Sequence, residues 1–568
     1  MTSTRTNASS FTREMLAGFA IANSNSLVAV DGGFVSKFRE RGRVAVVIGG
    51  GSGHYPAFAG VVGPGLATAA VCGDIFASPS SGQVFRVAKA AESGAGVLLS
   101  YGNYMGDTLN FSLAQEQLRA LGLDVRTVRV TDDISSAPAD SASERRGVAG
   151  DLVVFKIAGA AADLGYDLDA VERVAIEANS RVRTFGVAFS GCTLPGADSP
   201  LFSVPAGKMA LGLGVHGEPG IGEEELPTPE GLAKVLVGRL LPEVRAMDSK
   251  RITVLLNGLG TMKYEELFAV YGFVARELLG YGFEVIEPEV GELVTSLDMA
   301  GCSLTIASLT PELEELWLRD CNTPAFKKVR AKADELEVSQ SYSMQGEAFS
   351  EPENSAHYAA HVRRVFDELE ALMRAQESRL GELDTLVGDG DHGIGMARGA
   401  AGAARKLSES DVRGVVQGLS IAASGWSESG GGTSGAIWGI FLSSMASSLS
   451  TQSTLSATSI ADALKYAADQ VQEIGGARPG DKTMVDAMVP FVETFSARVQ
   501  SGDGLSASWV AASAEANAQA SATAKLLPRV GRARIHGEKG VGHPDAGAIS
   551  FALSVESLNT IMTEIGRD

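Results

Sequence analysis

The sequence predicts an α/β domain with a mostly parallel sheet, followed by a domain built only from helices. The chain has 568 residues, which exceeds the length at which one hydrophobic core keeps growing, so at least two domains are expected. Short apolar runs alternate with helical patterns as far as residue 330. Beyond residue 355 the apolar side chains recur at helical spacing, as at Val362, Val365, Phe366, Leu369 and Leu372.

The first domain is expected over residues 1–330. Candidate strands cover 44–48, 96–99, 125–130, 152–157, 184–189, 252–257 and 303–307, and candidate helices cover 83–91, 109–121 and 264–279. Such alternation is typical of an α/β domain with a largely parallel sheet. Residues 331–354 are charged and poor in large apolar side chains, which indicates a linker, and the helical domain is expected over 355–568.

Composition and charge exclude several classes of protein. Hydrophobic residues make up 45% of the chain and charged residues 20%, as in globular proteins, and the net charge of −20 argues against a nucleic-acid partner. The N-terminus lacks the apolar core of a signal peptide, and no apolar run is long enough for a membrane span, so a cytoplasmic protein is expected. The four cysteines, Cys72, Cys192, Cys302 and Cys321, form no CxxC pair and are expected to be buried thiols.

Three carboxylates stand within eight residues at Asp384, Asp389 and Asp391, with glycines between and after them. Mg²⁺ prefers carboxylate oxygens and usually keeps substrate phosphates among its other ligands, so the cluster indicates a site for a metal and a nucleotide. A surface turn rich in Asp and Gly is the alternative, because these residues favour turns for backbone reasons alone.

Three loops of the first domain carry candidate acid and base residues. The run 44–48 leads into a glycine-rich loop that ends at His54, a position where open α/β sheets place ligands. The spacing is not that of a dinucleotide fingerprint, and a histidine suits acid–base chemistry. Asp107 follows the strand signal at 96–99, and His216 lies in a second glycine-flanked loop. A structural loop residue is the alternative reading of His54.

Seven motifs, in this order along both domains, resemble the dihydroxyacetone kinase family in its fused form, with a ketose-binding domain followed by a nucleotide-binding domain. They are GGGSGH, GNYMGD, LGVHGEPG, LVGDGDHG, GGGTSGA, GARPGDKTMVDAM and GHPDAGA. The resemblance covers nearly the whole chain. It implies two subdomains in the α/β domain, a helical barrel in the second domain, and a homodimer.

The resemblance implies a role for each motif residue of the first domain. His216 would bond covalently to the carbonyl carbon of the ketose and form a hemiaminal. Asp107 would take the proton of the attacking hydroxyl, and His54 would be an acid–base and hydrogen-bonding partner. Gly51, Ser52 and Gly53 would line the same substrate site.

In the second domain the resemblance implies two Mg²⁺ ions held by Asp384, Asp389 and Asp391, with ATP as co-substrate. Phosphoryl transfer depends on positioning and charge neutralisation, which such a site supplies. The implied ATP-binding residues are His392, Gly393, Ile394, Gly395, Gly432, Thr433, Ser434, Gly475, Gly476, Met484, Arg532 and Asp545. Among cations that could contact a phosphate, Arg532 is preferred over Lys539.

Departures from the common family pattern bear on the substrate. Tyr55 and Phe58 follow the first motif, and Gly102 stands where the family commonly has a lysine, which removes a donor and opens space. The pattern resembles the family's erythrulose kinases, so D- or L-erythrulose is the expected substrate and dihydroxyacetone the alternative. A non-catalytic ketose sensor is disfavoured because the acid–base residues and all three aspartates are present. Fusion of the domains favours free ATP over a phosphoenolpyruvate-linked system.

Overall fold

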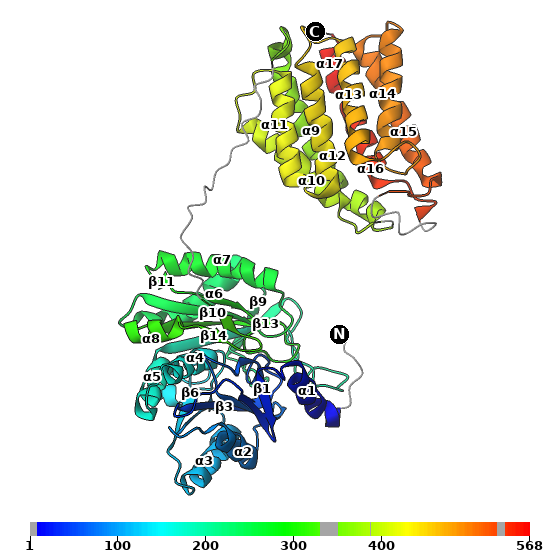
Figure 1. The fold of residues 1–568 in the computed structure, drawn as a ribbon. Coiled ribbons are helices and arrows are strands. Elements are labelled where there is room, and N and C mark those ends of the chain that lie inside the picture. The colour runs from blue at the N-terminus through cyan, green and yellow to red at the C-terminus, as the bar shows by residue number, and fades with distance from the viewer. Residues whose placement is uncertain (1–7, 330–349, 387, 531–539, 568) are drawn as a thin grey trace. The chain divides into compact units, whose positions relative to one another are not determined.

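The computed structural model describes residues 8–329, 350–386, 388–530 and 540–567. The chain divides into two compact units, Met1–Leu336 and Glu337–Asp568, and each is described by itself (Figure 1). The linker expected at 331–354 stays a prediction, because most of it lies outside the described residues. Within the described residues, no helix combines the length and the apolar character needed to cross a membrane.

The first sheet of the N-terminal unit has six strands in the order β1-β2-β4-β3-β5-β6. They are β1 (Leu27–Val30), β2 (Gly33–Ser36), β3 (Ala45–Ser52), β4 (Ala69–Ile75), β5 (Val97–Gly102) and β6 (Val125–Val130). The neighbours β4, β3, β5 and β6 pair in parallel. At one edge, β1 and β2 form an antiparallel hairpin, and β2 also pairs antiparallel with β4. The expected strands and parallel pairing are therefore confirmed at the centre of this sheet.

The second sheet has the order β11-β10-β13-β7-β8-β9, and β12 also pairs with β10. Its strands are β7 (Val182–Ala188), β8 (Lys208–Leu211), β9 (Gly222–Glu225), β10 (Arg251–Gly258), β11 (Glu284–Val285), β12 (Glu289–Gly291) and β13 (Gly301–Ser308). The central neighbours pair antiparallel, and only β11 and β12 run parallel to β10. Parallel pairing was thus the wrong expectation here, because β7, β10 and β13 come together from distant parts of the sequence.

Helices separate and cover the two sheets (Figure 1). On the outer face of the first sheet lie α2 (Ser81–Ala91) and α3 (Met105–Arg119), which share a core with Ala45 and Val47. Between the sheets lie α4 (Asp151–Asp163) and α5 (Leu168–Arg181), packed on Val46 of β3 and Leu255 of β10. The outer face of the second sheet packs against α6 (Pro229–Arg245) and α7 (Tyr264–Gly280).

The strand expected at 152–157 is wrong, because these residues belong to helix α4. Every residue from Asp151 to Ala162 is buried, because the helix lies between the two sheets. A helix that is apolar on all faces has no 3.6-residue periodicity, and its sequence is then indistinguishable from that of a buried strand.

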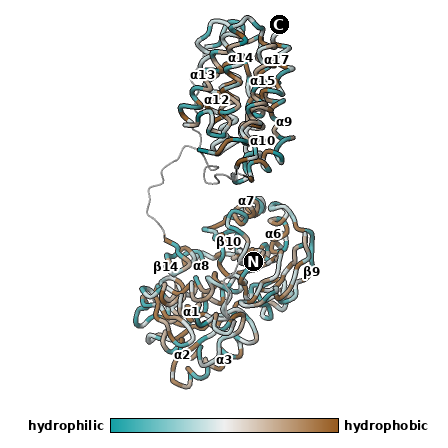
Figure 2. Tube along the Cα trace, turned by 90° about the vertical axis from the view of Figure 1, so that its right-hand side faces the viewer, coloured by the Kyte–Doolittle hydropathy of each residue, from teal (hydrophilic) through white to brown (hydrophobic). Residues whose placement is uncertain are grey.

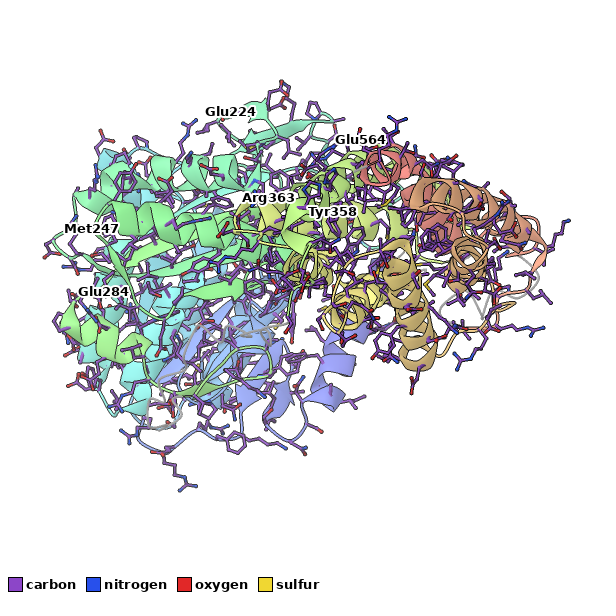
Figure 3. All side chains as sticks on the ribbon, turned by 90° about the horizontal axis from the view of Figure 1, so that it is seen from above. Glu224, Met247, Glu284, Tyr358, Arg363 and Glu564 are labelled. Atoms are coloured by element: carbon purple, nitrogen blue, oxygen red, sulfur yellow. The ribbon has the colours of Figure 1, made fainter. Side chains whose placement is uncertain are left out.

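Edges and smaller elements complete the N-terminal unit. Helix α1 (Ala8–Ala22) precedes the first sheet, and α8 (Pro311–Trp317) with the short strands β14 (Cys321–Asn322) and β15 (Lys327–Lys328) follows the second. The outermost strands of the second sheet carry charged side chains, Glu224 on β9 and Glu284 on β11 (Figure 3). Such charges oppose edge-to-edge pairing with another sheet. All four cysteines are free and buried, as expected.

The C-terminal unit is helical throughout its described residues, which confirms the expected class. Its long helices are α9 (Ala359–Thr385), α10 (His392–Ser408), α11 (Val415–Gly430), α12 (Gly432–Leu449), α13 (Ala457–Gly475), α14 (Val485–Gln500) and α15 (Leu505–Ala522), followed by α16 (Ala546–Ser557) and α17 (Asn559–Ile565). Apolar residues recur along the helices (Figure 2), and most of them gather in one core, where the rings of Trp426 and Trp438 stack 4.8 Å apart. Arg364 of α9 pairs with Glu564 of α17 at 2.6 Å.

Candidate active site

One pocket of the N-terminal unit lies at the carboxyl ends of β3 and β5. The loop after β3 contributes His54, the first turn of α3 contributes Asp107, and the loop after β8 contributes His216. All three residues singled out from the sequence line this pocket. Gly51 lines it as well, while the Ser52 hydroxyl donates to the carbonyl of Gly73 at 2.7 Å.

The two histidines of the pocket are joined by their ring nitrogens. Nδ1 of His54 lies 2.7 Å from the carbonyl oxygen of Thr295, which only accepts, so this nitrogen carries a proton. Nδ1 of His216 lies 2.9 Å from a carboxylate oxygen of Glu218 and donates to it in the same way. The two Nε2 atoms are 3.1 Å apart. A hydrogen bond between them therefore requires one further proton, which the pair shares.

Burial and charge affect the first histidine of the pair. Burial and, to a smaller extent, the adjacent His216 lower the pKa of His54 to about 3, which disfavours the proton on His54. Burial alone would raise the pKa of Glu218, but the hydrogen bond from His216 and its charge outweigh this and hold the pKa at about 2. The ionised Glu218 therefore balances the charge of the histidine pair.

Asp107 is a buried carboxyl beside the histidines. Burial raises its pKa, whereas a hydrogen bond from Ser78 and the charge of His216 lower it by less. The net result is a pKa of about 6. Its Oδ1 atom is buried and has no hydrogen-bond partner among the described residues. A carboxyl of this kind titrates near neutral pH and has a free acceptor, as a general base requires.

Aromatic rings hold the imidazoles in place. Phe76 stacks on His54 with the ring centres 5.0 Å apart, and Tyr104 contacts His216 edge-on at 4.9 Å. The Tyr104 hydroxyl is also buried without a hydrogen-bond partner in the described part of the chain. Buried polar atoms without partners are rare in folded proteins. Their presence in one pocket indicates a polar ligand.

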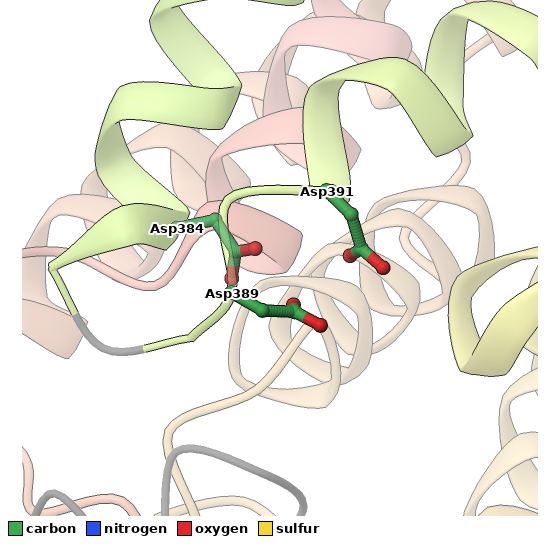
Figure 4. A group of neighbouring side chains, drawn as sticks. All are labelled: Asp384, Asp389 and Asp391. Carbon is green, nitrogen blue, oxygen red and sulfur yellow. The ribbon is translucent and has the colours of Figure 1, made fainter. Parts of the chain in front are cut away.

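The C-terminal unit brings Asp384, Asp389 and Asp391 together between α9 and α10 (Figure 4). One carboxylate oxygen from each lies within 4.8 Å of the others. Asp384 also shapes the loop, because its Oδ2 accepts from the backbone N–H of Gly390 at 2.9 Å. Three converging carboxylates fit Mg²⁺, which takes oxygen ligands.

Two helices begin beside these carboxylates. Helix α10 starts at His392 and α12 starts at Gly432. The imidazole of His392 joins three helices, since Nδ1 lies 3.2 Å from the Ser434 hydroxyl and Nε2 lies 3.0 Å from the Ser550 hydroxyl. Burial lowers the pKa of His392, so this ring is neutral. Free backbone N–H groups at helix N-termini favour phosphate.

The remaining residues of the expected nucleotide site lie near the start of α14 and α16. Helix α13 ends at Gly475, and Gly476 caps it in the left-handed conformation with φ of 74°. Met484 precedes α14 and is buried. Asp545 caps α16, and burial raises its pKa to about 7. Arg532 and Lys539 lie outside the described residues.

Comparisons with known proteins agree for both units. A Dak1 domain matches residues 17–325, and a DAK2 domain matches residues 386–560. The chain is 48% identical to a D-erythrulose kinase of Mycolicibacterium smegmatis, over 97% of both proteins. The chain belongs to the dihydroxyacetone kinase family. This confirms the resemblance that the seven motifs indicated.

Two further members of the dihydroxyacetone kinase family extend the comparison. The chain is 47% identical to an L-erythrulose kinase of Pectobacterium atrosepticum, over 98% of this chain and 95% of that one. Among solved structures, the dihydroxyacetone kinase of C. freundii in complex with AMP-PNP and Mg²⁺ is 31% identical, with a TM-score of 0.61 and 99% of each chain covered.

Three residues in or next to the pocket were not singled out from the sequence, although two of them stand inside its motifs. Tyr104 stands within GNYMGD and Glu218 within LGVHGEPG, so motif membership was the available signal. Asp151 lines the pocket from the start of α4 and belongs to no motif. It adjoins the apolar run that was interpreted as a strand, which concealed it.

Proposed function

We propose that this protein is an ATP-dependent kinase that phosphorylates a terminal hydroxyl of D- or L-erythrulose and releases erythrulose phosphate and ADP. One observation carries the proposal: the chain is 48% and 47% identical, over almost its full length, to proteins named D-erythrulose kinase and L-erythrulose kinase. Its identity to the dihydroxyacetone kinase of C. freundii is only 31%. Dihydroxyacetone is the alternative substrate.

Capture of the ketose follows from the shared proton of the histidine pair. In the arrangement that has the shared proton on Nε2 of His54, the Nε2 lone pair of His216 is free to attack the carbonyl carbon of the ketose. The new N–C bond forms as the carbonyl π electrons move to oxygen, and that oxygen takes the proton from Nε2 of His54. The product is a hemiaminal, and Glu218 keeps its hydrogen bond to Nδ1 throughout.

Asp107 acts at the reacting hydroxyl. Its ionised carboxylate takes the hydroxyl proton as the ketose oxygen bonds to the γ-phosphorus of ATP and the bond to the β,γ-bridging oxygen breaks. The captured carbonyl holds that hydroxyl in place, which supplies the orientation that phosphoryl transfer requires. Gly51 and Ser52 at the end of β3, with Gly53 after them, would form this edge of the substrate site.

The nucleotide is assigned to the C-terminal unit. Asp384, Asp389 and Asp391 would hold Mg²⁺, expected as two ions. Bound there, the metal would neutralise charge on the phosphates. The chain at His392, Gly393, Ile394 and Gly395, and at Gly432, Thr433 and Ser434, offers N–H groups and hydroxyls to the phosphates. Gly475, Gly476 and Met484 would surround the adenosine, with Asp545 and Arg532 completing the site.

A homodimer is part of the proposal. Transfer requires the ketose pocket of one unit to meet the nucleotide site of the other, either within one chain or between two chains. Sedimentation equilibrium should give a mass of about twice the 58.9 kDa of one chain. A mass of one chain at micromolar concentration would contradict the dimer.

The substrate assignment is tested by steady-state kinetics with Mg-ATP and D-erythrulose, L-erythrulose or dihydroxyacetone. We expect kcat/KM for one erythrulose isomer to exceed that for dihydroxyacetone by about tenfold or more. A clear preference for dihydroxyacetone would overturn the erythrulose assignment. Ketose binding without turnover of any of the three would instead indicate a sensor.

A further inference from the structure

Asp151 is a carboxyl that the reaction described so far does not use. It begins helix α4, is 3% exposed, and lines the ketose pocket together with Asp107 and His216. Its Oδ1 atom has no hydrogen-bond partner among the described residues. An unpaired buried carboxyl oxygen destabilises the free protein. A ligand group that hydrogen-bonds this oxygen on binding would remove that cost.

Two glycines allow the backbone to approach this carboxyl closely. A methyl group on Gly102 would lie 3.2 Å from Oδ2 of Asp151. A methyl group on Gly147 would lie 2.9 Å from Oδ1 of Asp151 and 2.4 Å from the Cα atom of Gly102. Side chains at these two positions would therefore crowd the carboxyl. Gly102 is also the residue that replaces the common family lysine.

Its surroundings favour the neutral, protonated form of Asp151. Burial raises its pKa well above the ordinary value, and the nearby Asp132 and Asp107 raise it further. Unlike Asp151, Asp132 has a hydrogen-bond partner for each carboxylate oxygen, because the two oxygens accept from the backbone N–H groups of Val148 and Gly150 at 2.8 and 2.7 Å. A protonated carboxyl carries one O–H donor and a free acceptor oxygen. This pair of groups matches an alcohol, which both donates and accepts.

The chemistry of the candidate substrates supplies such an alcohol. Dihydroxyacetone has one hydroxyl on each side of its carbonyl, whereas erythrulose has a further hydroxyl on its additional carbon. His216 and Asp107 are assigned to the carbonyl and to the reacting hydroxyl, which both ketoses have. Asp151 is a separate polar group of the same pocket. Within the described residues, the carboxylates that converge closely enough for a metal are those of the C-terminal unit.

We propose that Asp151 is a specificity-determining residue, which hydrogen-bonds the hydroxyl that a four-carbon ketose has and a three-carbon ketose lacks. The inference rests on the proposed ketose kinase function and deepens it. A pocket built to bond a hydroxyl discriminates strongly against the analogue without it, because the polar group of the protein is then left unpaired.

The test compares wild type, D151A and D151N with both ketoses. For D151A we expect kcat/KM for erythrulose to fall about tenfold to a hundredfold, and that for dihydroxyacetone to stay within about threefold. D151N is neutral, keeps a donor and an acceptor, and should retain the erythrulose preference within about threefold. Without ATP, intact-protein mass spectrometry measures the erythrulose concentration that half-saturates the covalent adduct. For D151A this concentration should rise by the same factor by which kcat/KM falls.

A purely structural role predicts different results. Because Oδ1 is unpaired, D151A should leave the Tm of the ligand-free protein unchanged or raise it, whereas a structural carboxyl would lower it when removed. Should D151A fail to fold, D151S is to be compared in its place. The inference is overturned if the alanine variant loses activity equally with both ketoses, if it keeps the wild-type preference, or if D151N behaves like D151A. Wild-type preference, measured in the same assay, tests the proposed function independently.

Discussion

The imidazoles of His54 and His216 meet nitrogen to nitrogen, and this contact determines what each can do. Both Nδ1 atoms are already committed to acceptors, Thr295 and Glu218, so the 3.1 Å contact between the Nε2 atoms needs a shared proton. In the proposed reaction, the pair thus holds the nucleophile and the acid of hemiaminal formation in one hydrogen bond. Glu218 compensates the charge, as buried networks require.

We predict that His216→Ala abolishes the covalent ketose adduct. No other nucleophile is assigned to the carbonyl carbon, so KM for the ketose should rise at least about tenfold. Intact-protein mass spectrometry with and without ketose gives the readout. Glu218→Gln is the graded comparison, because it keeps a hydrogen-bond acceptor but loses the charge, and it should retain a weaker adduct. A full-occupancy adduct on His216→Ala would exclude the assigned role.

The pH dependence of activity should report Asp107. Its pKa is raised to about 6 by burial, so the carboxyl is ionised above that pH and protonated below it. Because a base must be ionised, kcat/KM should fall about tenfold per unit as the pH drops below 6. The pKa of His54, about 3, lies outside this window. A profile that stays flat down to pH 5, with the protein still folded, would contradict Asp107 as the base.

At the scale of elements, one lysine connects the turn before α14 to two other segments. Lys482 is buried, and its Nζ donates to the carbonyls of Thr523, Gly540 and His543 at 3.0, 2.8 and 2.6 Å. All three carbonyls belong to the segment that connects α15 to α16. The lysine therefore holds in place the chain around Asp545, which caps α16.

We expect Lys482→Met to lower the free energy of unfolding of the C-terminal unit by about 3 kcal/mol, because several buried carbonyls lose a charged donor. Denaturant unfolding followed by tryptophan fluorescence measures this. KM for ATP should also rise. Lys465→Met is the matched control, since Lys465 is exposed on α13. Equal stability of the two variants would contradict the connecting role of Lys482.

The local sequence pattern was sufficient to predict most helices and strands, but not the direction in which the strands pair. The strands at β3, β5 and β6 were predictable, because short apolar runs lay between turn residues. Helix α4 was not, because burial on all sides removes periodicity. Strand direction in the second sheet was not predictable either, since β10 and β13 pair antiparallel across an intervening helix and two short strands.

At the scale of the whole molecule, the two units hold different parts of the chemistry. The residues proposed to capture the ketose belong to Met1–Leu336, and the carboxylates proposed to hold metal belong to Glu337–Asp568. A substitution in one unit should therefore remove ketose capture or metal binding and leave the other. The same division allows ketose binding to be measured without nucleotide.

Asp389→Ala should abolish Mg-ATP-dependent turnover, with kcat falling about a hundredfold or more, because charge neutralisation at the phosphates is lost. The ketose adduct on His216 should form as in the wild type, measured by mass spectrometry. Glu382→Ala is the control, since this exposed acid lies outside the carboxylate cluster. Loss of the adduct in Asp389→Ala, or full turnover, would contradict the division of roles.

The sequence by itself determined the family, the fold class and most of the candidate site residues, because these signals are local. Each motif places its glycines, histidine or carboxylates within a few positions of one another. Only the tertiary structure decided that His54 and His216, 162 positions apart, share a proton, and that Asp151 joins their pocket. The physical reason is that hydrogen bonding and burial depend on neighbours in space, which local sequence patterns do not specify.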